Sequence, residues 1–293
     1  MAQLSCVRGV IGGRLGRQTS GTRCGPAQLR FQDVVDGGIG PQLSNLEEFF
    51  LLSVGQVDQI WHYPVSSVGG EASLSADIDA TGVVGDRRYA LIDRGSGLPA
   101  APESDPRWRK ALYLQAKTIE GELPVICFPQ SEIFALMDRQ MNECLSDYFG
   151  FAAAVAAYAP SELHPGITLT QPRHHHHPLH VMTTESLTYL ATLRQTDTVD
   201  VRRFRPSVLM TIPEESGFVE SRWIGRSLQL GPTALLAEEE TRRCGMTFIG
   251  QPGIDEDPDI LRTILRHNKR HLGIYCSVSS SGTITVGDRI DVT

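Results

Sequence analysis

The chain has 293 residues, 41% of them hydrophobic and 21% charged, which suffices for one large or two ordinary domains with a hydrophobic core. A net charge of −7, from 27 basic and 34 acidic residues, argues against a general nucleic-acid-binding protein, and no apolar run approaches the roughly 20 residues of a membrane-spanning helix. The six cysteines include no CxxC pair, so neither a zinc knuckle nor a four-cysteine iron–sulfur site is expected, and reduced thiols in a cytoplasm fit best.

Residues 1–50 are expected to form an N-terminal extension. The first 32 residues contain five arginines and no acidic residue. An organelle transit peptide has such a composition, but several glycines interrupt a helical apolar face, which favours a flexible arm. Cytoplasmic localisation is therefore expected, with an organelle as the alternative.

From Val54 onward the chain has short runs of strand character. Such runs cover residues 54–63, 72–78, 88–92 and 111–119, and their spacing predicts an antiparallel sheet or barrel. Between Ser131 and Phe149, apolar residues recur at helical spacing, with Ser131 as the N-cap and Gly150 as the stop. The stripe predicts a core helix in which Cys144 is structural.

Residues 161–180 are rich in proline and histidine. They predict a connection between one unit at 51–160 and another at 181–293. The run His174–His177 could bind a transition metal, but four consecutive imidazoles do not converge on one ion, so we interpret the run as a solvated linker.

In the C-terminal unit, Thr183 or Thr184 can cap a helix whose free N–H groups suit an anionic ligand. Strands are expected at 207–212, 227–230 and 246–249, and a helix at 258–269 follows Asp257. The end of the chain predicts a closing hairpin of residues 273–278 and 283–286, then a strand at 289–292.

Two loops before residue 90 are candidate anion sites. Residues 63–70 end a strand with serine hydroxyls and glycine amides, although such loops usually only turn the chain. Residues 82–89 place Arg87 and Arg88 after a Gly-Asp turn. Arginine on a fixed turn can bind phosphate or carboxylate in a bidentate manner, but a solvated pair with Asp86 is the simpler interpretation.

A third candidate combines Arg202, Arg203 and Arg205 with Phe204 just before an apolar strand. If this stretch is extended, alternate arginines lie on one face of the strand. Their mutual repulsion is costly unless an anion or carboxylates neutralise their charge. Ligand binding is therefore slightly favoured over a structural role.

Cys244 directly follows Arg242 and Arg243 and is the fourth candidate. Nearby positive charge favours the thiolate, which attacks electrophiles or binds a metal. A buried, inert thiol is the commoner state of an arbitrary cysteine. The sequence contains no dinucleotide-binding, phosphate-loop, hydrolase or zincin motif.

Taken in order, these segments resemble the MOSC domain family, named for the C-terminal domain of molybdenum cofactor sulfurase. The resemblance extends from about Val54 to Val292, and six short markers in family order carry it. The markers are residues 60–67, 85–89, 203–207, Trp223 with 228–231, Arg243-Cys244 and 282–292.

The resemblance implies an α+β, predominantly β fold, with an N-terminal MOSC-type β-barrel subdomain packed on a MOSC β-barrel domain with peripheral helices. It also implies a pterin–molybdenum cofactor between the two units, with Cys244 as the metal ligand, as in the mitochondrial amidoxime-reducing component. By the same comparison, the cofactor-binding residues would be Ser67, Arg87, Thr183, Arg205, Ser207 and Arg242. The family commonly has Lys where this chain has Ser66 and Asn where it has Ser207.

The leading hypothesis is a molybdenum-dependent oxidoreductase that reduces small N-hydroxylated substrates, with electrons from a separate ferredoxin or cytochrome/flavin reductase. Two alternatives stay open. One is a sulfur carrier or sulfurtransferase that works through a Cys244 persulfide, and the other is a cofactor-free tailoring enzyme with the same fold. No nucleic acid and no membrane span are expected.

Overall fold

The computed structural model describes residues 54–119, 121–160, 165–173 and 177–293. The expected extension at residues 1–50 and most of the histidine run lie outside the described residues. No helix within the described ranges is long and apolar enough to cross a membrane.

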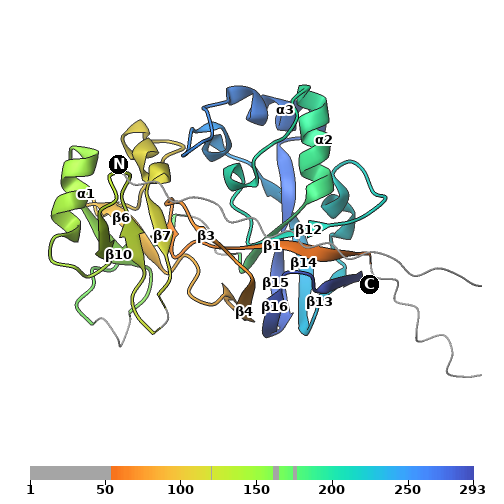
Figure 1. Ribbon diagram of the computed structural model, residues 1–293, viewed down its shortest axis with the longest axis horizontal. Coiled ribbons are helices and arrows are strands. Elements are labelled where there is room, and N and C mark those ends of the chain that lie inside the picture. Colours follow the sequence, from red (N-terminus) through yellow and green to blue (C-terminus); the bar gives the residue numbers. More distant parts are fainter. Residues whose placement is uncertain (1–53, 120, 161–164, 174–176) are drawn as a thin grey trace, which may run out of the picture. The chain divides into compact units, whose positions relative to one another are not determined.

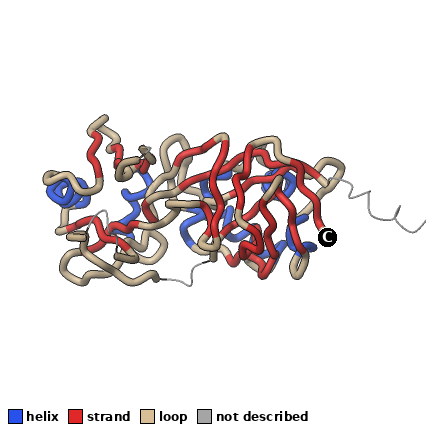
Figure 2. The backbone as a smooth tube through the Cα atoms, turned by 90° about the horizontal axis from the view of Figure 1, so that it is seen from below, coloured by secondary structure: helices blue, strands red, loops and turns tan. Residues whose placement is uncertain are grey.

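A closed β-barrel dominates the C-terminal part of the described chain (Figures 1 and 2). Seven described strands form it, and the last closes onto the first. In spatial order they are β12 (Val208–Thr211), β11 (Leu179–Thr183), β15 (His271–Ser280), β14 (Thr233–Arg242), β13 (Ser227–Leu230), β17 (Arg289–Val292) and β1 (Gly55–His62). The pair β11–β12 is parallel and the other barrel pairs are antiparallel. The predominantly β fold is thus confirmed.

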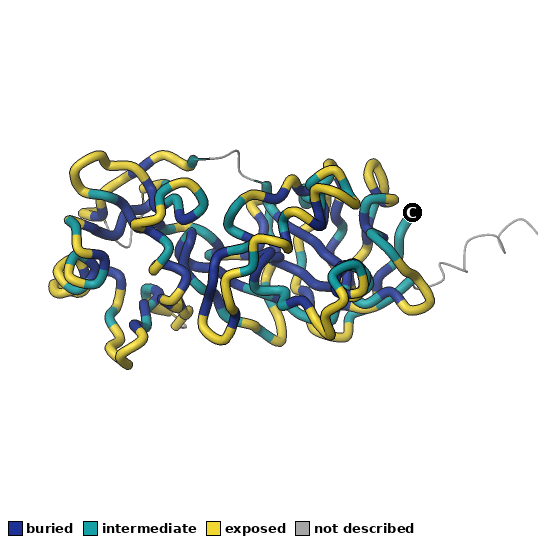
Figure 3. Tube along the Cα trace, turned by 90° about the horizontal axis from the view of Figure 1, so that it is seen from above, coloured by how far each residue is buried: buried dark blue, intermediate teal, exposed yellow. Residues whose placement is uncertain are grey.

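Alternating side chains of these strands fill the barrel. Val57, Val181, Met210, Leu235 and Ile274 are at most 1% exposed and belong to one apolar cluster. Figure 3 shows buried stretches along the strands and exposed residues at the turns. Burial of this apolar surface is the main stabilising contribution, at about 25 cal/mol per Å².

Smaller sheets and a second core form the rest. One sheet joins β10 (Ala153–Ala157), β6 (Tyr89–Asp93) and β2 (Val65–Ser66), and another joins β7 (Gln115–Lys117), β8 (Val125–Cys127) and β9 (Ile133–Ala135). Trp108, Leu145 and Phe149 are central members of the apolar cluster that these sheets share. Strand β3 (Glu71–Ser73) pairs with β1 at the edge of the large sheet. A further sheet joins β16 (Gly282–Thr285), β4 (Ser75–Asp79) and β5 (Gly82–Val83).

The helices lie on these sheets. The α-helices are α1 (Met141–Phe149), α2 (Thr184–Arg194) and α3 (Pro258–Asn268), and the 3₁₀-helices are η1 (Pro106–Tyr113), η2 (Val201–Arg203), η3 (Val219–Trp223) and η4 (Gly245–Phe248). The caps expected for α2 and α3 are present, because the Thr183 hydroxyl accepts from the Ser186 amide and Asp257 accepts from the Asp259 amide. Gly150 ends α1 with a left-handed φ of 82°.

The two sequence segments are interleaved in space. Strand β1 belongs to the N-terminal segment, yet it closes the C-terminal barrel, and β4 pairs with β16 along Ser75–Ile78 and Gly282–Thr285. Two of the sheets therefore contain strands from both segments, whereas the sheets β10-β6-β2 and β7-β8-β9 lie within the N-terminal segment.

Several predicted elements were wrong. The helix expected from Ser131 begins only at Met141, because Ile133–Ala135 pairs with β8, and Ile133 is 61% exposed. The predicted strand at 246–249 is the 3₁₀-helix η4, and residues 111–113 belong to η1. The predicted closing hairpin does not form, because β15 pairs with β11 and β14 while β16 pairs with β4.

Candidate functional site: a cysteine at an arginine-lined cavity

A cavity of about 280 Å³ collects side chains from segments far apart in the sequence. We call it the first cavity. Its lining includes Ser66, Ser67, Arg87, Arg173, His180, Arg205, Arg242, Arg243 and Cys244. A cavity of this size suits a small ligand or part of a larger one.

Cys244 reaches the cavity because it lies between two elements. Strand β14 ends at Arg242, and η4 begins at Gly245, with the Cys244 carbonyl accepting from the Thr247 amide at 3.2 Å. The cysteine is exposed, unlike Cys276, which is buried inside the barrel and whose thiol has its pKa raised by burial. Cys244 is therefore the described cysteine with both access to solvent and an arginine-rich surrounding.

Five arginines give this cavity its positive character, namely Arg87, Arg173, Arg205, Arg242 and Arg243. Arg87 pairs with Asp86 and Arg173 pairs with Glu103. Within the described residues, Arg205 and Arg243 form no ion pair, and Arg205 Nη2 and Arg243 Nε are buried without a hydrogen-bond acceptor. Burial lowers the pKa of Arg205 to about 10, so this side chain stays charged at neutral pH. Uncompensated buried cations favour an anionic ligand.

Hydrogen bonds connect these arginines through His180. Arg243 Nη2 donates to the Phe204 carbonyl at 2.7 Å, and its Nη1 lies 3.2 Å from His180 Nε2. His180 Nδ1 lies 3.4 Å from the Arg205 carbonyl. Burial, together with the charge of Arg243, holds the pKa of His180 well below its usual value, so the ring is neutral. We assign the Nδ1–H tautomer, which donates to Arg205 and accepts from Arg243.

Three of the predicted site residues have left-handed backbone. Ser67, Arg87 and Arg205 have φ values of 63°, 48° and 55°. Such a conformation costs a non-glycine residue about 1 kcal/mol or more, and it persists where surrounding contacts enforce it. The Arg87 amide donates to the Tyr63 carbonyl at 2.8 Å, and the Ser67 hydroxyl donates to the Ala100 carbonyl at 3.1 Å. Strain at three residues of one cavity is typical of a functional site.

Tyr63 lies beside two of the cavity arginines. The guanidinium carbons of Arg205 and Arg87 lie 4.2 Å and 5.0 Å from the centre of its ring. The Tyr63 amide donates to Asp86 Oδ1 at 2.6 Å. Burial raises the pKa of Tyr63 to about 12, so the phenol is neutral and its ring face supports the cations.

The structure brings five of the seven predicted site residues together: Ser67, Arg87, Arg205, Arg242 and Cys244. Thr183 and Ser207 do not line the cavity, because both are fully buried. The Thr183 hydroxyl donates to Glu220 at 2.8 Å and accepts from the α2 amide of Ser186. Ser207 lies at the start of β12 and its hydroxyl accepts from the His180 amide at 3.3 Å.

The expected shared face of the arginines at 202–205 does not exist. Residues 201–203 form η2, so the three guanidiniums diverge. Arg202 pairs with Asp200 at 2.7 Å, and Arg203 donates to the carbonyls of Thr247 and Asp255. Arg205 alone of the three enters the first cavity.

Sequence reasoning missed Arg173, and it interpreted His177 and His180 as parts of a solvated linker that could alternatively bind a metal. His177 is not a solvated linker residue, because its ring stacks on Tyr275 at 4.1 Å and it pairs with Glu239. The signal for His180 was its place at the start of an apolar stretch, which forms β11 and is buried at all five positions.

The fold and the cavity together define a β-barrel protein with an exposed thiol at a cationic small-molecule site. Two family descriptions match this chain: "MOSC N-terminal beta barrel domain" over residues 54–116 and "MOSC domain" over residues 160–291. The chain belongs to the MOSC domain family.

Two solved structures are similar at low sequence identity. The YuaD protein from Bacillus subtilis has 13% identity and a TM-score of 0.45, over 81% of this chain and 94% of that chain. YiiM from Geobacillus stearothermophilus has 14% identity and a TM-score of 0.32, over 40% of this chain and 54% of that chain. No curated protein matches this chain significantly.

Proposed function

We propose that the protein is an oxidoreductase that binds a pterin–molybdenum cofactor in the first cavity and reduces small N-hydroxylated substrates. The observation that carries this proposal is the exposed Cys244 beside two buried guanidiniums, Arg205 and Arg243, that lack carboxylate partners among the described residues. Family membership supports the same class of chemistry.

The residues present fit such a group. No cluster of three or more His, Cys, Asp or Glu side chains within the described chain could hold a metal alone. A metal at Cys244 therefore needs its other donors from a cofactor, and the sulfur donors of a pterin dithiolene match a soft thiolate ligand. The buried donors without acceptors, Arg205 Nη2 and Arg243 Nε, suit the phosphate of such a cofactor.

Each residue has a defined role in this proposal. Cys244 would hold the metal, Arg87, Arg205 and Arg243 would bind the phosphate, and Ser67 and Arg242 would line the space for the pterin. When bound, the cofactor supplies two-electron transfer of an oxygen atom. The protein orients it, compensates its negative charge and holds His180 neutral beside Arg243. Electrons come from a separate reductase.

The test is molybdenum per chain after expression in a host that makes the cofactor, with benzamidoxime reduction measured using a chemical electron donor. We expect stoichiometric molybdenum in the wild type, a loss of metal and activity in Cys244→Ser, and wild-type behaviour in the control Cys144→Ser on α1. A wild-type chain without molybdenum, from a host proven to load another MOSC protein, would contradict the proposal.

A second function, sulfur transfer, is favoured by the exposure of Cys244 to solvent. The thiolate would take the outer sulfur of a donor persulfide, releasing the donor thiol, and then pass that sulfur to an acceptor. Intact-mass measurement after incubation with a persulfide donor distinguishes this function. A gain of one sulfur atom at Cys244 in molybdenum-free protein supports it, and an unmodified Cys244 argues against it.

A further inference from the structure

A second cavity of about 270 Å³ has four aromatic side chains in its lining, namely Trp61, Tyr63, Tyr113 and Phe128. Trp61 lies near the end of β1 and Tyr63 directly after this strand. Tyr113 is the last residue of η1, and Phe128 follows β8. The rings of Trp61 and Tyr63 lie within 16° of parallel, with centroids 6.2 Å apart. Flat apolar walls around a space of this size suit a planar ring system.

The charge in this second cavity is positive. Its described lining contains two charged side chains, Arg202 and Arg205, and no carboxylate. Arg202 is neutralised by Asp200 at 2.7 Å. Arg205 is the single described residue that lines both the first and the second cavity, and its Nη1 donates to the Val68 carbonyl at 2.7 Å. Its charge therefore has no carboxylate partner from either side within the described chain.

Two residues that line this cavity each carry a hydrogen-bond donor without an acceptor among the described residues. These donors are Arg205 Nη2 and the Tyr63 hydroxyl, and both atoms are buried without a partner in the described part of the chain. Leaving a buried polar group unpaired costs about 1–3 kcal/mol, and more when the group is charged. A carboxylate offers two acceptor oxygens to two such donors.

We propose that the second cavity is a binding site for a planar aromatic acid of one or two fused rings, whose carboxylate is held by Arg205 and Tyr63. The rings of the ligand lie against the aromatic side chains of the cavity, and its carboxylate neutralises the charge of the Arg205 guanidinium. The site shares Arg205 with the proposed cofactor site in the first cavity, so it is tested in protein that carries no molybdenum cofactor.

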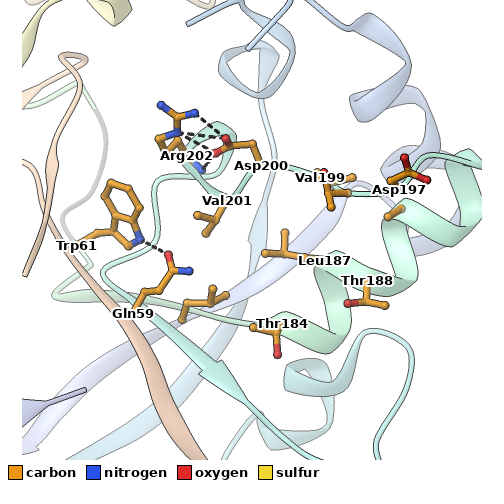
Figure 4. A pocket seen from close by; sticks show the side chains of 13 residues that line it. Gln59, Trp61, Thr184, Leu187, Thr188, Asp197, Val199, Asp200, Val201 and Arg202 are labelled. Carbon is orange, nitrogen blue, oxygen red and sulfur yellow. Dashed lines mark hydrogen bonds and ion pairs between the residues drawn. The ribbon is translucent and has the colours of Figure 1, made fainter. Parts of the chain in front are cut away.

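A larger hollow of about 390 Å³, lined by α2 and residues 197–202, carries a weaker case (Figure 4). It shares Trp61 and Arg202 with the second cavity, but the donors of these two side chains are occupied. Trp61 Nε1 donates to Gln59 at 2.9 Å and Arg202 pairs with Asp200, as the dashed lines in Figure 4 show. An aromatic acid has more to gain in the second cavity.

The first experiment compares two probes of equal shape by isothermal titration calorimetry. The full chain, expressed without molybdate, is titrated with 2-naphthoate and with neutral 2-naphthamide. We expect saturable binding of 2-naphthoate, weaker by at least about 10-fold for 2-naphthamide, because charge-assisted hydrogen bonds are lost. No binding of 2-naphthoate at millimolar concentration, or equal affinity for both probes, would overturn the proposal.

The second experiment locates the site with three cysteine variants. Cys127→Phe fills the second cavity, Cys244→Phe fills the first, and Cys144→Phe on α1 fills neither. We expect only Cys127→Phe to weaken 2-naphthoate binding, by about 10-fold or more. Loss of binding in Cys244→Phe alone would place the acid in the first cavity and refute the proposal. If Cys127→Phe does not fold, nuclear Overhauser effects between 2-naphthoate and the Trp61 and Phe128 rings decide: their presence supports the site, and their absence overturns it.

Discussion

Arg87 Nη2 donates a 3.1 Å hydrogen bond to the carbonyl oxygen of Arg205, a residue 118 positions later in the chain. The same carbonyl lies 3.4 Å from His180 Nδ1, and His180 Nε2 in turn lies 3.2 Å from Arg243. One backbone oxygen thus contacts Arg87 and His180 directly, and His180 links it to Arg243. A left-handed φ at Arg205 turns its peptide so that both donors can reach this oxygen.

The first prediction separates the side chain of Arg205 from its backbone strain. Arg205→Ala removes the 2.7 Å bond to the Val68 carbonyl and the contact with the Tyr63 ring, so the free energy of unfolding should fall by about 2 kcal/mol. Arg205→Gly loses the same contacts but relieves a φ of 55°, so it should be about 1 kcal/mol more stable than the alanine variant. Urea unfolding followed by tryptophan fluorescence measures both. A glycine variant less stable than the alanine variant would show that this φ is not strained, and both variants should retain less molybdenum.

The second prediction concerns His180 and acid. Because burial depresses its pKa in the folded state, the unfolded chain takes up this proton first as the pH falls below about 6.5. The stability contributed by neutral His180 is therefore present above that pH and lost as the pH falls toward the folded pKa, by at most about 1.4 kcal/mol per pH unit. His180→Gln should flatten this slope in urea unfolding. The control His267→Gln, at an exposed position of α3, should keep the wild-type slope, and equal slopes in all three proteins would contradict the assignment.

Five of the seven residues that the sequence singled out line one cavity, whereas several of the predicted elements around them were wrong. Cys244 with Arg242, and Arg87 after its Gly-Asp turn, are recognisable because turn residues and charge patterns are local. The caps at Thr183, Asp257 and Gly150 are local for the same reason.

The failures share a different cause, which is distant pairing. Ile133 continues a helical pattern of apolar residues. The structure instead pairs it with Cys127, and pairs Ala135 with Val125, because strand pairing outweighs the local helical preference. Residues 282–285 follow β15 directly, but their partner is β4, about two hundred residues earlier. His180 looked like part of a linker because its contacts with Arg205 and Arg243 exist only in the folded chain.

The third prediction concerns Glu220, a carboxylate buried under the start of α2. It accepts from the Thr183 hydroxyl at 2.8 Å and from the Gly273 amide at 3.0 Å. Burial outweighs these hydrogen bonds and raises its pKa above the ordinary 4.5. The stability it contributes is full below 4.5 and declines as the pH rises through the folded pKa. The unfolding free energy of the wild type, minus that of Glu220→Gln, should therefore fall with rising pH across this window. A difference that rises with pH would show a lowered pKa instead.

The last prediction concerns Gly273, whose missing side chain leaves room for His180. A Cβ at this position would collide with His180 Nε2 and lie 2.8 Å from Met182 Cγ, and the residue has a φ of 83°. Gly287 has a similar φ of 95° but open space around it. Gly287→Ala should therefore cost only the backbone strain, about 1 kcal/mol, whereas Gly273→Ala should cost about 3 kcal/mol or more. Because a displaced His180 no longer supports Arg243, Gly273→Ala should also retain less molybdenum than Gly287→Ala. Equal losses of stability in the two variants would mean that β15 can shift to make room for the added methyl group, and that His180 does not pack tightly on Gly273.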